Sequence, residues 1–176
     1  ALIGKWHLGE YPENQPLHNG FDYHFGFLTG GMSDYYRHVQ LYRQGIPVEG
    51  EGHMTDVITD EAVGFLKSAG GQPFFLMLAY TAPHTPLQSL ERYREMYGAG
   101  DDDARSYLGL VTHLDDSIGR LMDMLKSEGL DENTCVIFAS DNGSQSRTTD
   151  SNFPFAGYKN SLHEGGIHVP MIVRWS

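Results

Sequence analysis

TDVITDEAVGFLKSAGGQPFFLMLAY, residues 55–80, contains the pattern that decides the fold class. Its first part has apolar residues at helical spacing, which predicts a helix capped by Thr55 or Thr59 and ended by the glycine pair at 70–71. Its last part, residues 74–80, is continuously apolar and predicts a strand buried on both faces of a parallel sheet. The apolar positions of the helix are Ile58, Ala62, Phe65 and Leu66.

The alternation of helix and strand continues downstream. A second helix is predicted over 111–125, ending near Gly129, with its apolar stripe formed by Val111, Leu114, Ile118, Leu121 and Leu125. The runs at 134–140 and 167–175 predict two more strands, the latter at an edge or bulge because it contains Pro170. Together these elements predict an α/β fold with a mostly parallel sheet flanked by helices, as one domain or a piece of one.

The first third of the chain has weaker signals. Residues 1–3 are apolar and predict a short strand, but the rest of residues 1–54 is rich in Gly, Tyr and His and shows little periodicity. The stretch NGFDYHFGFLTGGMSDYY, residues 19–36, has too many glycines and aromatics for a regular helix. We expect packed, irregular loop structure there.

Composition excludes several classes of function. The chain has 176 residues, with 12 Lys and Arg against 23 Asp and Glu, which gives a formal charge of −11. This charge argues against binding to nucleic acid or to an anionic membrane surface. The longest apolar run is far too short to span a membrane, and the chain does not start with a signal peptide. A single cysteine excludes an internal disulfide and a cysteine-rich zinc site. An anionic substrate would need local positive charge from a few Lys, His or a metal ion.

Polar residues come after three of the predicted strands, at the edge where α/β sheets bind ligands. Lys5 and His7 come after the strand at 1–3, and His84 comes after the strand at 74–80 in a stiff loop between two prolines. Asp141 and Asn142 come after the strand at 134–140. The sequence therefore predicts that chemically complementary groups gather at one sheet edge.

Each of these groups also has a plainer interpretation. Asp141 and Asn142 offer oxygen ligands that suit Ca²⁺ or Mg²⁺, but Asp-Asn-Gly is also an excellent turn sequence. Lys5 and His7 would point to the same side of an extended segment, where they could hold an oxyanion or move a proton. Taken singly, Lys5, His7, His84 and Lys159 are also ordinary surface or packing residues.

A second possible metal cluster lies on the helix predicted over 111–125. His113, Asp115 and Asp116 form the motif HLDD. Because Leu114 and Ile118 mark the buried stripe, these residues are expected at its edges or outside it. We therefore expect a solvated or structural role for them.

Four motifs occur together in one order: GKWHLG at 4–9, PHTP at 83–86, SDNG at 140–143 and GYKNSLHEGGIHVPMIVRW at 157–175. Their order resembles that of the sulfatase family, meaning the arylsulfatase-type, formylglycine-dependent members of the alkaline phosphatase superfamily. The resemblance covers essentially the whole chain. It implies an alkaline-phosphatase-like α/β core that hydrolyses sulfate monoesters of a sugar or an aryl alcohol, such as a sulfated small molecule or glycan.

The resemblance also implies roles for individual residues. Lys5, His84 and Lys159 match the residues that hold the sulfate oxygens, and His7 matches the histidine that hydrogen-bonds the formylglycine nucleophile. Asp141 and Asn142 match one pair of ligands to Ca²⁺, which is expected in preference to Mg²⁺. Export to the periplasm or outside the cell, or a lysosomal location, is implied by the family. The oligomeric state is not.

The nucleophile motif of the family, C-x-P-S-R with a Cys or Ser that becomes formylglycine, is absent from the chain, as is the upstream Asp-Asp pair. We therefore expect residues 1–176 to be the central part of one sulfatase catalytic domain, incomplete at both ends and inactive alone. Two alternatives stay open. One is a phosphatase, phosphodiesterase or phosphonate hydrolase of the same superfamily, and the other is a non-catalytic pseudoenzyme scaffold.

Overall fold

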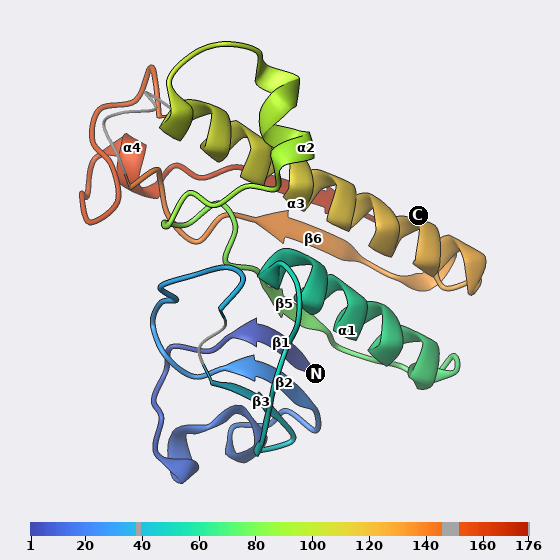
Figure 1. Ribbon diagram of the computed structural model, residues 1–176. Coiled ribbons are helices and arrows are strands. Elements are labelled where there is room, and N and C mark those ends of the chain that lie inside the picture. Colours follow the sequence, from blue (N-terminus) through green and yellow to red (C-terminus); the bar gives the residue numbers. More distant parts are fainter. Residues whose placement is uncertain (38–39, 146–151, 176) are drawn as a thin grey trace. The chain divides into compact units, whose positions relative to one another are not determined.

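A computed structural model describes residues 1–37, 40–145 and 152–175 (Figure 1). The chain divides into two compact units, Ala1–Glu128 and Gly129–Ser176. Each unit combines strands with helices, and the α/β class predicted from the sequence is confirmed.

The first unit is built on a five-stranded sheet with the order β4-β3-β2-β1-β5 (Figure 1). Strand β1 (Leu2–Lys5) lies between β2 (His24–Phe27) and β5 (Met77–Ala79) and runs parallel to both. The antiparallel hairpin of β3 (Leu41–Arg43) and β4 (Ile46–Val48) extends the sheet beyond β2. The parallel centre of the sheet is therefore β2-β1-β5, the arrangement that places the ends of β1 and β5 at one edge.

Strand β2 lies inside the stretch that was expected from the sequence to be irregular, and that expectation was wrong. All four residues of β2 are buried. Gly26 pairs with Gly4 of β1, and a Cβ built on Gly26 would lie 1.9 Å from the carbonyl oxygen of Gly4. The glycine that made the segment resemble a loop is thus required by the close approach of the two strands.

Helix α1 spans Met54–Ala69 and ends, as predicted, at Gly70, which adopts a left-handed conformation with φ of 55°. Its N-cap is His53 rather than a threonine, because the His53 side chain accepts a hydrogen bond from the backbone N–H of Thr55. Thr55 and Thr59 are instead buried inside the helix, where the Thr59 hydroxyl donates to the carbonyl of Thr55 at 2.6 Å. The predicted threonine cap was therefore wrong.

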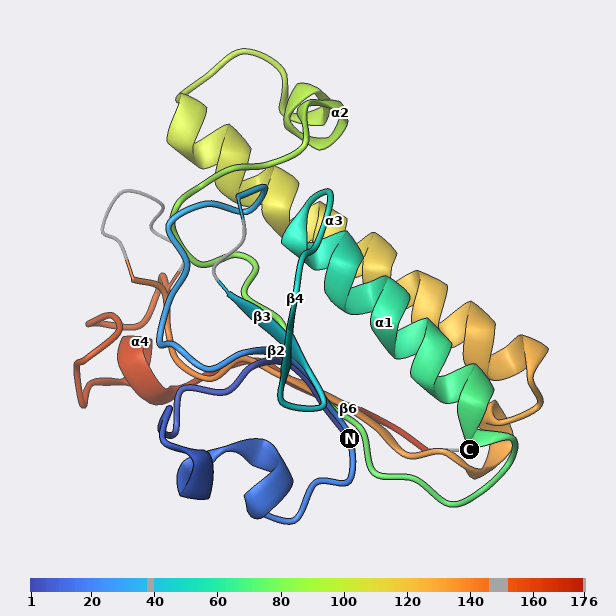
Figure 2. The same cartoon turned by 60° about the horizontal axis from the view of Figure 1, so that its bottom comes forward.

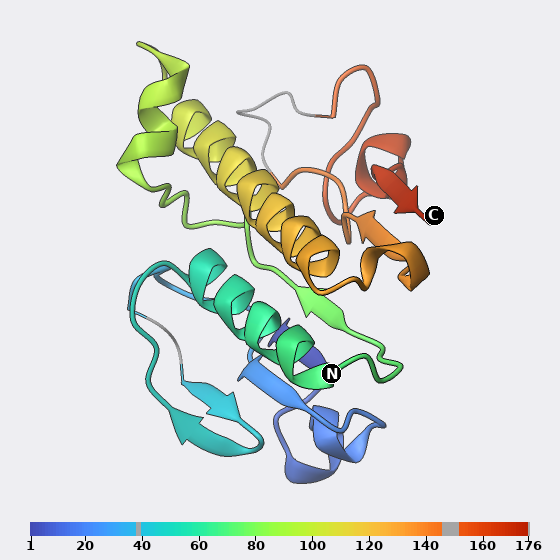
Figure 3. The same ribbon diagram turned by 90° about the vertical axis from the view of Figure 1, so that its right-hand side faces the viewer.

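Helix α3 spans Asp102–Ser127 and begins well before the predicted helix, because the Asp101 carboxylate caps it by accepting from the N–H of Ala104. It lies beside α1 in Figure 2 and in Figure 3 and packs against it. The expected stripe is correct at Leu114, Leu121 and Leu125, which are buried. Val111 is exposed, since the buried face runs instead through Leu110 and His113.

Helix α1 packs mainly over β1 and β2, and short helix α2 (Glu91–Arg94) packs on α3. Among the described residues, strand β5 lies at the edge of the five-stranded sheet, next to β1. Phe75, which precedes β5, is 71% exposed, and Met77 is exposed as well. The expectation of a strand buried on both faces was therefore wrong, because β5 borders a single strand and lies beyond the part of the sheet that α1 mainly covers.

The second unit contains a two-stranded antiparallel ladder of β6 (Val136–Ala139) and β7 (Met171–Arg174), with the one-turn helix α4 (Glu164–Ile167) between them in sequence. Pro170 immediately precedes β7 and its carbonyl accepts from the N–H of Ser140. Ile137 of β6 is 60% exposed, so the burial predicted for this strand was wrong as well. The ladder presents its apolar side chains to solvent because only two strands are paired in it.

Among the described residues, no helix has the length and apolar character needed to cross a membrane.

Candidate active site

Lys5 is the last residue of β1 and is aligned with Phe27 of β2. The backbone N–H groups of Trp6 and His7 then donate to the carbonyls of Phe27 and Leu28, at 3.0 and 3.1 Å. His7 itself has a φ of +57°, which is the left-handed region. The segment is therefore not extended at His7, so the alternation of side chains along an extended strand does not apply there.

The side chain of His7 packs against a glycine, Gly30, that was not among the predicted site residues. The imidazole of His7 lies against Gly30, where a Cβ would clash with the ring. Gly30 stands in the loop after β2, so the two strand ends meet at this contact. A Gly-Gly pair directly after an aromatic strand, residues 30–31, is the signal that pointed to it.

His84 lies in the loop after β5, the other parallel neighbour of β1. Its backbone N–H donates to the carbonyl of Thr81 at 2.8 Å, and its ring Nδ1 lies 2.7 Å from the carbonyl oxygen of Thr85. Because a carbonyl can only accept, Nδ1 carries the proton and Nε2 is the ring atom left for a ligand. An imidazolium would present a second N–H at Nε2, directed toward an anion.

Lys5, His7 and His84 thus belong to one edge of one sheet. Gly4 is aligned with Ala79 across β1 and β5, so the residues after the two strands emerge side by side. Parallel strands carry their ends to one edge of a sheet, which is the basis of the prediction made for these residues from the sequence. It gathers one lysine and two histidines, which can provide positive charge and a proton carrier.

Asp141 and Asn142 come after β6 in the second unit, in a bend. The side-chain amide of Asn142 donates from Nδ2 to the carbonyl of Gly143 at 2.9 Å, and the Ser140 hydroxyl donates to the carbonyl of Asn142 at 2.8 Å. These are the local bonds of a turn, as expected from the plainer interpretation. They orient the side chain of Asn142 by its nitrogen, so the turn does not conflict with a metal ion at its side-chain oxygen.

Lys159 lies on a neighbouring loop of the same unit. Its backbone N–H donates to the carbonyl of Ser144 at 2.9 Å, and the N–H of Gly143 donates to the carbonyl of Gly166 at 3.0 Å. Asn152 joins the two loops further, because it accepts from the N–H of Ser144 and donates to the carbonyl of Gly157. The segment with Asp141 and Asn142 is therefore fastened to the segment with Lys159.

Glycines allow the backbones of these two loops to approach closely enough for the hydrogen bonds. A Cβ on Gly143 would lie 1.8 Å from the carbonyl oxygen of Gly165, and one on Gly165 would lie 2.2 Å from that of Gly157. The backbones of the two loops thus touch where any side chain would separate them. The structure divides the predicted residues between the two units, with Lys5, His7 and His84 in the first and Asp141, Asn142 and Lys159 in the second.

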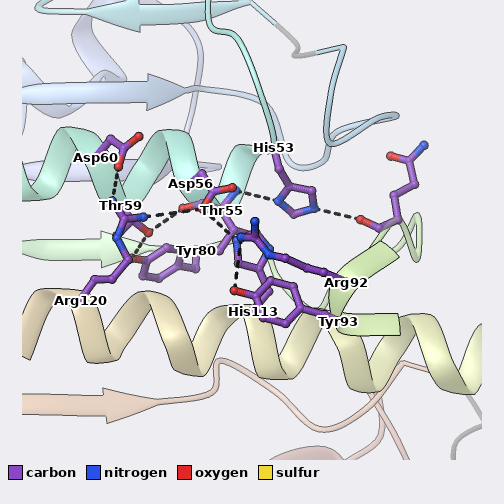
Figure 4. A network of polar contacts seen from close by, with 11 residues as sticks. His53, Thr55, Asp56, Thr59, Asp60, Tyr80, Arg92, Tyr93, His113 and Arg120 are labelled. Atoms are coloured by element: carbon purple, nitrogen blue, oxygen red, sulfur yellow. Dashed lines mark hydrogen bonds and ion pairs between the residues drawn. The ribbon is translucent and has the colours of Figure 1, made fainter. Parts of the chain in front are cut away.

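The HLDD segment does not form a metal cluster. Asp115 and Asp116 are exposed, whereas His113 is 1% exposed and its Nε2 lies 2.9 Å from an oxygen of Asp56 (Figure 4). Within residues 1–37, 40–145 and 152–175, no three His, Cys, Asp or Glu side chains are grouped so that they could hold a metal ion. The expected structural role fits His113, but its expected place outside the buried stripe was wrong.

Comparison with known proteins identifies the family. The model of the sulfatase family matches residues 1–176, which is the whole chain. The chain belongs to the sulfatase family. Among its relatives, the uncharacterized sulfatase YdeN of Escherichia coli is 33% identical over 99% of this chain and 36% of its own length. The mouse N-acetylgalactosamine-6-sulfatase is 32% identical over 99% of this chain and 37% of its own length.

A solved structure resembles this sulfatase chain closely. The crystal structure of Ps i-CgsB in complex with k-i-k-neocarrahexaose has a TM-score of 0.94 and 35% identity, and the match covers 99% of this chain and 44% of that one. The sulfatase chain thus spans a little over a third of the length of the curated relatives and under half of that solved chain. The description of residues 1–176 as the central part of one catalytic domain stays a prediction.

Proposed function

We propose that the protein containing this chain hydrolyses sulfate monoesters by a calcium-assisted formylglycine mechanism. The observation that carries the proposal is the group of Lys5, His7 and His84 after two adjacent parallel strands, in a chain that the sulfatase family model matches over its full length. A sulfate ester is an anion, and the chain as a whole carries a charge of −11. Positive charge must therefore be local, and this edge of the sheet provides it.

The cationic residues take the sulfate oxygens in this proposal. Lys5, Lys159 and His84 hold the three oxygens that do not react, and their charge stabilises the negative charge that spreads over the sulfuryl group in the transition state. His84 contributes through Nε2, since its Nδ1 is engaged with the carbonyl of Thr85. Groups fixed by the backbone need little reorganisation when the charge moves, which is the basis of their catalytic value.

His7 is proposed as the residue that hydrogen-bonds the nucleophile and carries a proton during turnover. The nucleophile itself, a formylglycine made from Cys or Ser, is expected outside residues 1–176. The contact of His7 with Gly30 supports this role, because it fixes the ring against backbone rather than against a mobile side chain.

Asp141 and Asn142 are proposed as two of the ligands of Ca²⁺. The oxygens of a carboxylate and an amide suit this hard cation, and the amide of Asn142 is already oriented through its nitrogen. Two oxygens do not complete a coordination sphere, so the remaining ligands are expected from segments beyond this chain. The bound ion would supply further positive charge next to the sulfate group.

The proposed substrates are sulfated glycans. The proposal rests on two relatives whose names state a ligand or a substrate, N-acetylgalactosamine-6-sulfatase and Ps i-CgsB in complex with k-i-k-neocarrahexaose. A periplasmic, secreted or lysosomal location agrees with such substrates.

Turnover by the full-length protein tests the proposal. Lys159→Ala should lower kcat/KM for a sulfated sugar or an aryl sulfate by about a hundredfold, because the lost charge acts on the transition state. Lys67→Ala is a matched control, since Lys67 is an exposed lysine in the last turn of α1. Equal turnover by Lys159→Ala and the parent protein would remove Lys159 from the site.

The coding sequence on the N-terminal side of Ala1 tests the mechanism. A Cys or Ser in a C/S-x-P-x-R setting, preceded by an Asp-Asp pair, would support the formylglycine mechanism. A different residue at that place would favour a phosphatase-like hydrolase of the superfamily or a non-catalytic scaffold.

A further inference from the structure

Two buried side chains outside the candidate site hold the loop that carries His84. The hydroxyl of Tyr35 donates to the backbone carbonyl of His84 at 3.0 Å. The backbone N–H of Tyr35 donates to the side-chain oxygen of Gln88 at 2.7 Å, and Nε2 of His53 lies 2.9 Å from the backbone carbonyl of Gln88. Tyr35 is 0% and His53 2% exposed, so these bonds are shielded from water.

His53 has a fixed tautomer because both of its ring nitrogens are engaged. Nδ1 accepts from the backbone N–H of Thr55 at 3.2 Å, which makes His53 the N-cap of α1. Nε2 must then carry the proton, since its partner is the carbonyl oxygen of Gln88. Figure 4 shows His53 at the start of α1, with one contact to the helix and one directed away from it. One imidazole therefore joins the first turn of α1 to the end of the His84 loop.

The ring is held in this position by a column of aromatic side chains. The centroid of His53 lies 4.7 Å from that of Tyr35 and 4.7 Å from that of His113. Tyr93 stacks on His113 at 4.8 Å and closes the column. Such packing leaves His53 no room to turn, so its two hydrogen bonds keep their directions.

We propose that Tyr35 and His53 are positioning residues, which place the imidazole of His84 by fixing both ends of the segment 84–88. The proposal rests on the function proposed above for His84. Neither residue needs to contact substrate or metal, because each acts on the backbone of the loop or on Gln88. Removing either should leave the charges of the site unchanged but let His84 drift from its productive place, which lowers the rate.

Two substitutions of His53 separate positioning from stability. In His53→Asn the amide oxygen takes the place of Nδ1 and can still cap α1, whereas nothing reaches Gln88. In His53→Gln the amide nitrogen takes the place of Nε2 and can still donate to Gln88, whereas the cap is lost. In the full-length protein we expect His53→Asn to melt earlier than the parent, because the carbonyl of Gln88 loses its shielded partner, and to lose about tenfold in kcat/KM. We expect His53→Gln to melt earlier and keep most of its turnover.

A purely structural role for His53 would give a different result, because turnover would then fall in both variants in step with the melting temperature. That result would overturn the proposal. Tyr35→Phe is the second test and needs no substitution at the helix start. It removes the hydroxyl that donates to His84 and also bonds the Thr81 side chain, and it should also lower kcat/KM by about tenfold. Tyr23→Phe is its matched control, since the hydroxyl of Tyr23 bonds Glu61 and not the loop.

Amide hydrogen exchange of the full-length protein gives a readout that does not depend on activity. Peptides from residues 81–90 should exchange faster in His53→Asn and Tyr35→Phe than in the parent, and at parental rates in His53→Gln and Tyr23→Phe. Unchanged exchange in both of the first two variants would overturn the proposal. An inactive parent protein with this exchange pattern would instead contradict the proposed function and leave the role of Tyr35 and His53 in holding the loop supported.

Discussion

The imidazole of His7 lies directly against the backbone of Gly30: a Cβ placed on Gly30 would be 2.0 Å from Nε2 of His7. The next residue, Gly31, has nothing within 4 Å of such a Cβ. Neither glycine needs a left-handed backbone, so a methyl group at either position acts only through the space it occupies. Two adjacent glycines thus have opposite relations to the candidate site.

Gly30→Ala should therefore displace the ring of His7 at little cost in stability, because the atom it meets is the end of a side chain that can move. We expect kcat/KM of the full-length protein for an aryl sulfate to fall by about tenfold or more, since misplaced catalytic groups are costly. Gly31→Ala should turn over like the parent. Steady-state kinetics of the two variants checks this, and equal rates for both would show that His7 is not needed where the structure places it.

Removal of calcium should abolish turnover of the full-length protein. Asp141→Ala should weaken calcium binding strongly, because the substitution removes a carboxylate ligand. Calorimetric titration of Ca²⁺ into the chelator-treated protein measures the affinity. Asp115→Ala serves as the control, as Asp115 is an exposed carboxylate on α3. Weaker binding in Asp115→Ala would mean that the HLDD segment supplies ligands after all.

Stability should fall with acidity through His24. Burial lowers the pKa of His24 from its ordinary 6.5 to about 4, because the charged ring would lose its hydration. Below pH 6.5 the unfolded chain therefore binds a proton that the folded chain does not, and the free energy of unfolding declines by up to about 1.4 kcal/mol per pH unit until pH 4. Above pH 6.5 this contribution is fully present.

Urea unfolding of the parent, His24→Gln and His18→Gln at pH 7 and pH 5 measures this effect. His24→Gln should lose less stability between the two values than the parent. His18 is exposed, so His18→Gln should match the parent. Identical losses in all three proteins would show that His24 titrates normally in the fold.

Gly143→Ala should displace both loops of the second unit, the one with Asp141 and the one with Lys159, because its Cβ would meet the carbonyl oxygen of Gly165. We expect weaker calcium binding together with lower kcat/KM. Gly119→Ala is the control, since Gly119 lies in α3 with nothing within 4 Å of its Cβ, and should raise stability by about 1 kcal/mol. Calcium titration and thermal unfolding of both variants test this prediction. Normal calcium affinity in Gly143→Ala would contradict the close backbone contact between Gly143 and Gly165.

The sequence predicts the elements with local signals. Helix α1 ends where Gly70 predicts it, and the leucines of α3 form the buried stripe that their spacing predicts. The start of α1 could not be predicted in this way, because an imidazole caps it in place of the short polar side chains that usually mark a helix start. Strand β2 was hidden by Gly26, whose purpose is set by a strand that lies twenty-two positions away in the chain.

In the candidate site, too, features with a local sequence signal could be predicted and features that depend on distant residues could not. Lys5 and His84 could be found from their places at and after the ends of two strands, because the direction of parallel strands carries their ends to one edge. Asp141 could be found because it follows β6. The conformation of His7 and its contact with Gly30 depend on a backbone turn that no spacing rule describes. The link from Tyr35 to His84 joins residues 49 positions apart, and only the folded chain reveals it.

The imidazole of His53 has two separate roles, because it caps α1 and bonds the backbone of Gln88. No other standard side chain places an acceptor nitrogen and an N–H donor on opposite edges of so small a ring. A lineage that loses this histidine gives up either the cap of α1 or the hold on Gln88, and it needs a second change elsewhere to recover the missing part. Both partners are backbone groups, so no change of side chain at 55 or 88 restores the lost bond, and we expect position 53 to vary little among relatives over evolutionary time.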